Sequence, residues 1–262
     1  MIGMQIFLHF LASPIDELPL MSFHGPMKCR KIFLLCATLL LASCASYVTP
    51  GGPANLKAIT EPSVKKSFDA KPAIHFPANL ALVRVQDGGY RSPTANGVGR
   101  GAYSVLTKRD IEKESDIDTL SRLPGVAGVV TLNRLLVPAD LSTDVELREA
   151  AAKLHADAIL LYTIATEFHD RDVIAPLTTL SLGLAPNTHY KIQSSASAVL
   201  IDTKTGFVYG ALEEDADRSG LTISWGSSDV IDAARKKAER EALDKLLANF
   251  GPFWDRIKAR YH

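Results

Sequence analysis

Residues Thr143–Ala165, TDVELREAAAKLHADAILLYTIA, indicate the fold more strongly than any other part of the chain, and we call them the decisive stretch. Its first four residues match a capping box, in which the side chains of Thr143 and Glu146 bind each other's backbone N–H groups and start a helix. Apolar residues then recur at helical spacing up to Leu154. From Ala158 the run is apolar on both faces, which is typical of a strand in the middle of a covered sheet. A helix that leads directly into such a strand predicts a βαβ crossover.

Shorter apolar segments precede this unit and extend the same pattern. Leu80–Val85 is typical of a buried strand, and Tyr103–Thr107 and Val126–Val137 predict two more. Between them, residues 110–123 space their apolar side chains for a helix that ends at Pro124-Gly125. The chain before the decisive stretch therefore alternates strands and helices, as a mixed sheet requires.

The segments that follow predict an antiparallel hairpin and a long helix. Residues 190–202 alternate along their length, Lys204-Thr205-Gly206 forms a turn, and Phe207–Leu212 returns. Ser228 then caps an Ala- and Leu-rich helix, which we expect to stop at Gly251-Pro252.

The composition fits one globular domain. The chain has 262 residues, 47% of them hydrophobic and 22% charged, with a formal net charge of +0. Such a balance excludes a disordered chain and gives no basic excess for nucleic acid, so we expect no nucleic-acid partner. We predict an α/β (α+β) fold with a single mixed β-sheet and packed helices over residues 80–262. The three cysteines all lie within the first 44 residues, which leaves the domain without a disulfide or a cysteine metal site.

The amino terminus has the layout of a targeting signal. Residues 27–43 begin with basic side chains and continue with an apolar run that is too short to span a bilayer, which needs ~20 residues. Small residues precede Cys44, so we expect cleavage between Ser43 and Cys44. Residues 1–26 do not fit a signal peptide, and we expect a mis-assigned upstream extension with Met27 as the true start. A long translated leader is the alternative.

The end of this signal, Leu41-Ala42-Ser43-Cys44, resembles the lipobox of bacterial lipoproteins. The resemblance implies acylation of the Cys44 thiol and attachment to the membrane through the lipid. In that family an Asp after the cysteine commonly retains the protein at the inner membrane. Ala45 at this position therefore implies an outer-membrane anchor that faces the periplasm.

The segment between lipid and domain, residues 44–79, is rich in Pro and Gly and shows no apolar periodicity. We expect an extended, lipidated tether with a reach on the order of 100 Å.

The order of elements around residues 78–250 carries a second resemblance. A helix, a step at Asp157, a strand, a hairpin with Asp202 and Gly206, and a final Ala-rich helix are similar to the α/β domain of the curli secretion (CsgG-type) lipoproteins. The TolB amino-terminal domain and the rhombotail-type lipoproteins are also similar. The resemblance implies an assembly or export accessory role in the cell envelope, as a homo-oligomer or within an envelope complex. A subunit of an oligomeric ring or pore is an alternative, although the sequence lacks a pair of ~10-residue barrel segments like those of the curli channel.

Several polar groups resemble parts of known sites but lack the spacing that chemistry needs. The glycine run at residues 97–101 has neither the GxGxxG nor the P-loop pattern, and we interpret it as a flexible surface loop. We interpret the acidic and histidine cluster as a solvated strand end, and the serines as strand hydroxyls. We expect no catalytic residue, no metal, no cofactor and no enzyme activity. The alternative is a periplasmic hydrolase whose site is assembled from dispersed residues. The acidic and histidine cluster consists of Glu167, His169, Asp170 and Asp172, and the strand serines are Ser194, Ser195 and Ser197.

One apolar segment stands apart. Residues 174–186 contain no charge and are bounded by Pro176 and Pro186. A monomer normally buries such side chains, because exposing each one costs ~1.5–3 kcal/mol. We expect a contact outside the domain, made by Leu177, Leu180, Leu182 and Leu184.

Overall fold

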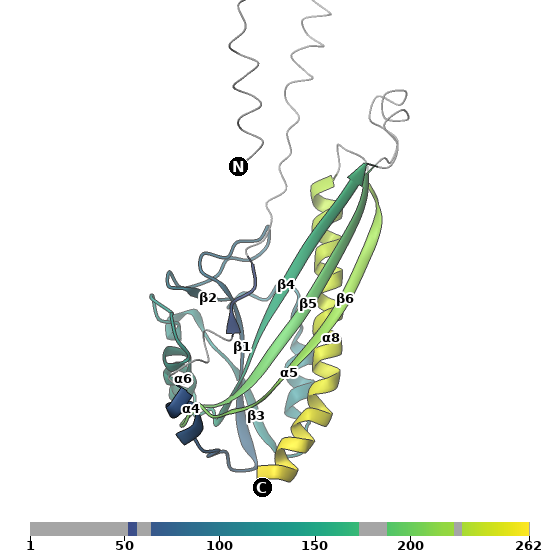
Figure 1. Cartoon of the computed structure of the whole chain (residues 1–262). Coiled ribbons are helices and arrows are strands. Elements are labelled where there is room, and N and C mark those ends of the chain that lie inside the picture. Colours follow the sequence, from purple (N-terminus) through teal and green to yellow (C-terminus); the bar gives the residue numbers. More distant parts are fainter. Residues whose placement is uncertain (1–51, 57–63, 173–187, 223–226, 262) are drawn as a thin grey trace, which may run out of the picture. The chain divides into compact units, whose positions relative to one another are not determined.

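The computed structural model describes residues 52–56, 64–172, 188–222 and 227–261 (Figure 1). One six-stranded mixed sheet has the strand order β2-β1-β4-β5-β6, and β3 also pairs with β1. The predicted α+β fold with a single mixed sheet is confirmed. The strands are β1 (Ala78–Asp87), β2 (Tyr103–Val105), β3 (Val126–Thr131), β4 (Ala158–Asp172), β5 (Thr188–Asp202) and β6 (Val208–Thr222). The helices are α4 (Val64–Asp69), α5 (Glu114–Ser121), α6 (Asp144–Lys153) and α8 (Ser227–Tyr261), with a 3-10 turn at Arg134–Leu136.

The decisive stretch folds as its sequence predicts. Thr143 caps α6: its side chain accepts the N–H of Val145, and Glu146 accepts the Thr143 N–H at 3.0 Å. Helix α6 leads into β4, which pairs in parallel with β1. Strand β3 pairs in parallel with the same strand. The connections from β1 to β3 and from β3 to β4 are therefore both crossovers between parallel strands.

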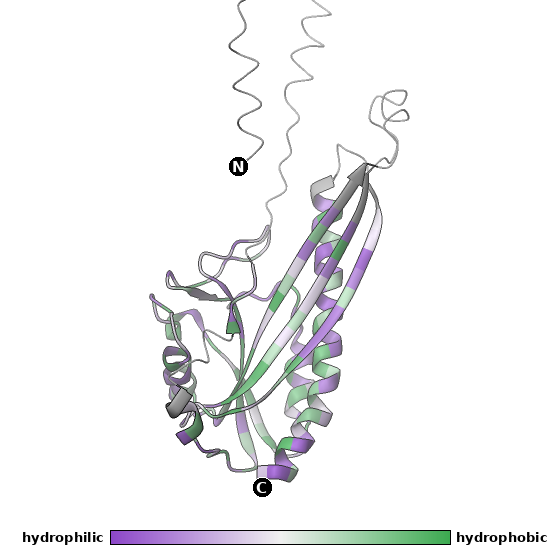
Figure 2. Cartoon of the chain, in the orientation of Figure 1, coloured by the Kyte–Doolittle hydropathy of each residue, from purple (hydrophilic) through white to green (hydrophobic). Residues whose placement is uncertain are grey.

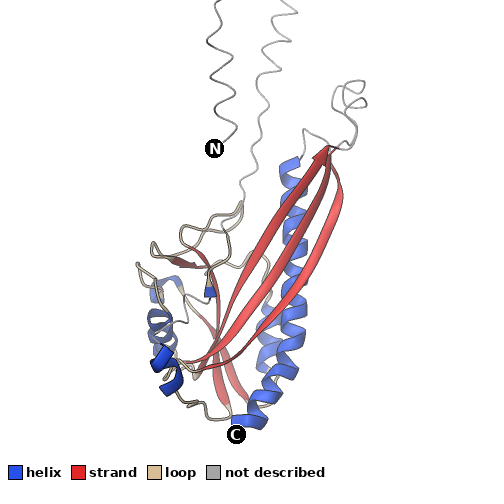
Figure 3. Cartoon of the chain, viewed as in Figure 1, coloured by secondary structure: helices blue, strands red, loops and turns tan. Residues whose placement is uncertain are grey.

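The sheet separates two apolar cores. On one face Leu80, Leu160 and Leu200 pack beneath α8 with its buried aromatic residues. On the other face Val83 and Leu161 pack with α6. Figure 3 shows α8 along one face of the strands and α6 apart from it. Because successive strand residues point to opposite faces, one doubly apolar strand such as β4 serves both cores.

Helix α8 does not stop at Gly251-Pro252 as expected but continues to Tyr261. Beyond the proline, Phe253, Trp254 and Ile257 extend the buried stripe of the helix. A proline inside a helix costs about 3 kcal/mol, whereas burying each large apolar side chain gains about 1.5–3 kcal/mol. The gain from three such residues outweighs the loss, so the helix runs on.

Two predicted elements are shorter than their apolar runs. The strand expected over residues 126–137 ends at Thr131 and is followed by the 3-10 turn. Asn133 caps this turn by accepting the N–H of Leu135. The helix expected from residue 110 begins at Glu114, because Asp110 and Glu112 are held by other contacts described below.

The hairpin strands are longer than predicted, with 15 residues each in β4, β5 and β6. Past Ile164 the described chain places no strand on the β1 side of β4. The three strands continue together to the row formed by Asp172, Thr188 and Thr222. We call residues 165–172, 188–195 and 215–222 the arm. Figure 2 shows more polar colouring along the arm than along the rest of strands β4, β5 and β6.

Parts of the segment 44–79, which we expect to be a tether, lie against the domain. Gly52 accepts the N–H of Asp87 at 3.2 Å, and Ala54 is buried and donates its N–H to Thr163 at 3.0 Å. Ile74 is also buried. Small and apolar residues between the prolines allow these pieces to fill gaps at the sheet, which a composition rich in Pro and Gly conceals.

Candidate functional site

A network of buried charges lies between the sheet and α8. Arg84 of β1 contacts Asp110 at 3.0 Å, Glu112 at 3.1 Å and Glu239 of α8 at 3.4 Å. Arg235, one turn before Glu239, pairs with it at 2.7 Å. The side chains of these five residues are at most 10% exposed. Two cations and three carboxylates are thus removed from water, and they stabilise one another only as a complete set.

Sequence reasoning missed this network, although two signals pointed to it. Arg84 is the single charge in the apolar run of β1 and shares a face with Leu80 and Leu82. Arg235 and Glu239 lie four residues apart on α8, close to its buried alanines. The ion-pair partners of Arg84 lie 26 to 155 residues away from it in the chain, so no local pattern connects Arg84 with them.

Burial and neighbouring charges shift the pKa values of Arg84, Glu112 and Tyr162. Burial alone would lower the pKa of Arg84, but the carboxylates of Glu112, Glu239 and Asp110 raise it. Burial would raise the pKa of Glu112, yet Arg84 and the hydroxyl of Tyr162 hold it below its ordinary value. Burial, together with Glu112, raises the pKa of Tyr162. These groups bind one another as fixed donors and acceptors, a pattern unlike that of a catalytic acid or base poised near pH 7.

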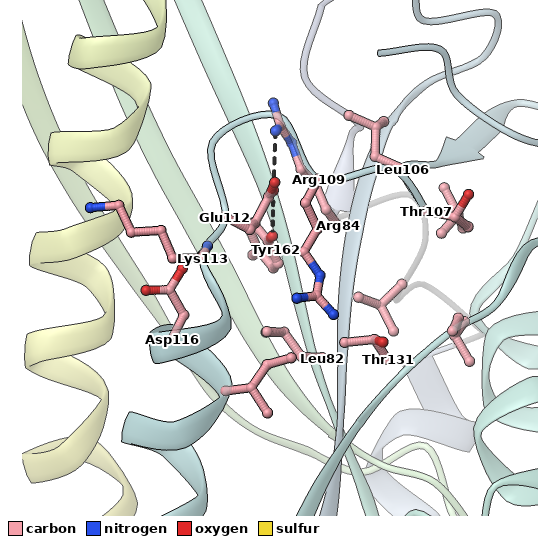
Figure 4. Close-up of a pocket in the computed structure, with 14 residues that line it drawn as sticks. Leu82, Arg84, Leu106, Thr107, Arg109, Glu112, Lys113, Asp116, Thr131 and Tyr162 are labelled. Atoms are coloured by element: carbon pink, nitrogen blue, oxygen red, sulfur yellow. Dashed lines mark hydrogen bonds and ion pairs between the residues drawn. The ribbon is translucent and has the colours of Figure 1, made fainter. Parts of the chain in front are cut away.

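A small cleft adjoins the network (Figure 4). Glu112 lies between the Arg84 guanidinium and the Tyr162 hydroxyl, which donates to it at 2.7 Å. Arg109 and Lys113 also line the cleft, whose volume is about 70 Å³. This volume holds a few water molecules, whereas sites for organic ligands measure about 300–1,000 Å³. The buried Nε of Arg84 lacks a hydrogen-bond partner among the described residues, and water in the cleft would suit it.

The outer face of the arm carries some of the polar residues that the sequence singled out, among them Glu167 and Ser195. Glu167, Gln193 and Asp217 form one cross-strand row, and Ala165, Ser195 and Asp215 form the next. Ser195 donates to Asp215 and Ser197 donates to Glu213, whereas Ser194 faces inward beside Thr166. Within the described residues no hydrogen bond joins a serine to a histidine, and no group of three or more His, Cys, Asp or Glu could hold a metal ion.

Residues 88–101, which follow β1, form a surface loop with internal hydrogen bonds. Arg91 and Asn96 pair across a turn in which Ser92 accepts the N–H of Ala95 at 2.9 Å. Gly97 donates to Tyr90 at 2.9 Å. Glycine is required where the loop packs closely, since a Cβ at residue 101 would lie 2.1 Å from the Leu141 carbonyl oxygen. We call residues 88–101 the glycine loop.

Several expected site residues lie outside the described residues. These are the cleavage and lipidation residues Ser43 and Cys44 and the contact residues Leu177, Leu180, Leu182 and Leu184. Their roles stay predictions. No helix in the part of the chain that the structure describes is long and apolar enough to cross a membrane.

Comparison with known proteins adds little. No family model and no curated protein matches the chain. A solved structure of a Caulobacter crescentus CB15 protein, provisionally named a lipoprotein, is similar over 42% of this chain and 79% of its own. The identity is 14% and the TM-score 0.26, values too low to carry an argument about function.

Proposed function

We propose that the protein is a lipid-anchored cell-envelope protein whose α+β domain is an interaction module held close to the membrane. The lipobox-like sequence ending at Cys44 supports the anchor. The observation that carries the proposal is the docking of Gly52 beside Asp87 at the end of β1. Only residues 45–51 separate this point from Cys44, so the lipid and the domain lie within about 28 Å of each other, even with these residues fully extended.

The direction of the arm supports a contact role. Strands β1 and β4 are parallel, so the arm points to the end of the sheet at which Gly52 is bound. Eight further residues, 165–172, extend β4 by about 26 Å. The connection that follows, residues 173–187, has the uncharged apolar sequence described above. Tether and arm are similar in length, so a lipid at Cys44 and a contact at Leu177, Leu180, Leu182 and Leu184 are compatible.

The finer parts of the proposal follow from the sequence. Ala45 favours the outer membrane, and the partner is an envelope protein complex or a second copy of this chain. The module is proposed to be non-enzymatic, which is supported by serines that bind acidic side chains and by charges that pair with each other.

Metabolic labelling tests the anchor. Cells that grow with a clickable palmitate analogue should label the wild-type protein and not Cys44→Ser, and the variant should leave the membrane fraction. Equal labelling of the two proteins contradicts the proposal.

A second experiment tests the contact. Leu180→Ser together with Leu182→Ser should leave thermal stability unchanged but lower cross-linking to membrane or partner in cells. Ser195→Ala on the exposed arm face provides the control. A variant that unfolds several degrees earlier would place these leucines in the core and contradict the contact role.

A further inference from the structure

The glycine loop carries unpaired positive charge at one end of the sheet. Arg91 and Arg100 are both exposed, and no ion pair among the described residues includes either one. Both line one open hollow of about 610 Å³ together with Asn96 and several glycines. Arg84 and Arg235, by contrast, form ion pairs in the interior.

The backbone of the loop adds further donors. Gly89 and Gly99 have φ angles of 76° and 112°, which favour glycine and turn their amides out of the strand direction. Neither amide donates a hydrogen bond to an acceptor within the described chain. Free amides beside guanidinium groups form a concave surface that suits an anion with several oxygens, such as a phosphate.

Two carboxylates lie near the hollow but do not line it. Asp87 precedes the loop and accepts the N–H of Gly88 at 3.0 Å. Asp140 is exposed and follows Ala139, whose carbonyl accepts the Arg100 N–H. The lining itself contains no acidic residue, so the hollow is positive where a ligand would bind.

The position of the loop selects the source of the phosphate. Gly88 directly follows Asp87, whose N–H binds Gly52, the first described residue after the proposed anchor. A domain tethered by seven residues keeps this end near the bilayer, where lipid phosphates are far more concentrated than free phosphate. We propose that the glycine loop binds the phosphate groups of anionic lipid headgroups, an inference that rests on the proposed lipid anchor at Cys44.

Fluorescence in lipid nanodiscs tests this proposal with the full, lipidated protein. Acylation occupies the Cys44 thiol and cleavage removes the other two cysteines, so Ala102→Cys gives a unique dye site next to the loop. Quenchers on the lipid headgroups should reduce dye emission more in discs that contain phosphatidylglycerol than in phosphatidylcholine discs. An arginine near an anionic surface contributes about fivefold to association, so Arg91→Gln with Arg100→Gln should weaken loop association about 25-fold.

The matched control removes the same charge at the opposite end of the sheet. Lys153→Gln with Lys204→Gln changes two exposed residues near the start of β4, and it should leave the quenching unchanged. Equal quenching in both lipids, or no effect of the arginine substitutions, overturns the headgroup proposal while the protein still elutes with the discs. Wild-type protein that fails to elute with the discs instead overturns the anchor, and the inference that rests on it.

Discussion

We call the sheet and its helices outside the arm the lower domain. The lower domain and the arm share strands β4, β5 and β6 but are held by different forces. Below Ile164 the strands lie between two apolar cores, and α8 contributes Phe250 and Trp254 to one of them. In the arm the strands have α8 on one face and solvent on the other, and the contact is a small cluster around Ile192, Ala234 and Ala238. The same hydrogen-bonded ladder therefore joins a well-packed region to a thinly packed one.

The buried ionic network lies where these two regions meet. Thr166, the second residue of the arm on β4, donates to Glu239 at 3.1 Å, and Glu239 binds both Arg84 and Arg235. An ion network stabilises less than an apolar core of the same size but requires one geometry. Apolar burial therefore holds the lower domain, and we expect the paired charges to fix the direction of the arm.

The first prediction concerns the apolar packing of the lower domain. Trp254→Ala should lower the free energy of unfolding by about 4 kcal/mol, because the substitution leaves a large cavity. The indole is fully buried, donates to the Pro124 carbonyl at 3.1 Å and lies against Phe250 and Phe76. Denaturant unfolding followed by circular dichroism measures the change. A loss below about 1 kcal/mol would show that the end of α8 past Pro252 does not hold the core.

The second prediction removes one cation from the buried ionic network between the lower domain and the arm. Arg84→Met should cost about 3 kcal/mol at pH 7, because it leaves Glu112 buried without its cation and leaves Asp110 and Glu239 with Arg235 alone. Denaturant unfolding of the variant and the wild type, measured at the same pH, gives the difference.

The pH dependence of this loss identifies its cause. Arg84 holds the pKa of Glu112 below its ordinary value of 4.5. The stability that the folded protein gains from the Arg84–Glu112 pair is therefore fully present above pH 4.5. It is lost as pH falls through the lower pKa that Glu112 has in the folded state. The gap between wild type and Arg84→Met should narrow below pH 4.5. A gap independent of pH would assign the loss to packing rather than to charge.

The third prediction compares two fully buried aliphatic residues. Ile192→Ala in the arm should cost about 2 kcal/mol and act locally, whereas Leu246→Ala in the lower core should destabilise the whole domain. Hydrogen exchange separates the two effects. Amides of residues 165–169 and 192–195 should exchange faster in Ile192→Ala while those of β1 keep their protection. Equal acceleration throughout the sheet would make arm and lower domain one cooperative unit.

The sequence predicts the lower region better than the arm, and the physical reason lies in the range of the interactions. The cap at Thr143 and the alternation of β5 are local patterns, and both are confirmed. The arm half of β4 lacks apolar residues on one face. The apolar pattern in the sequence therefore ends before the strand does. The network at Arg84 depends on partners distant in sequence, which spacing alone does not reveal. The glycines of this loop are visible in the sequence, but the unpaired state of Arg91 and Arg100 emerges only from the contacts.

Ser194 and Ser195 are neighbours in β5 and lie on opposite faces of the arm. Ser194 is 1% exposed and shares a hydrogen bond of 3.1 Å with Thr166, which in turn donates to Glu239. Ser195 points to the solvent side and donates to Asp215. Loss of a buried hydrogen bond costs about 1 kcal/mol, whereas an exposed one is replaced by water.

The two alanine substitutions remove the same atom, so each is the control for the other. Ser194→Ala should lower the free energy of unfolding by about 1 kcal/mol, and Ser195→Ala should change it by less than about 0.5 kcal/mol. Unfolding midpoints in denaturant resolve such a difference when both variants are measured together. Equal costs would mean that both faces of the arm are shielded from water, as they are in the lower domain. That result would contradict the arrangement in which α8 covers one face of the arm and solvent the other.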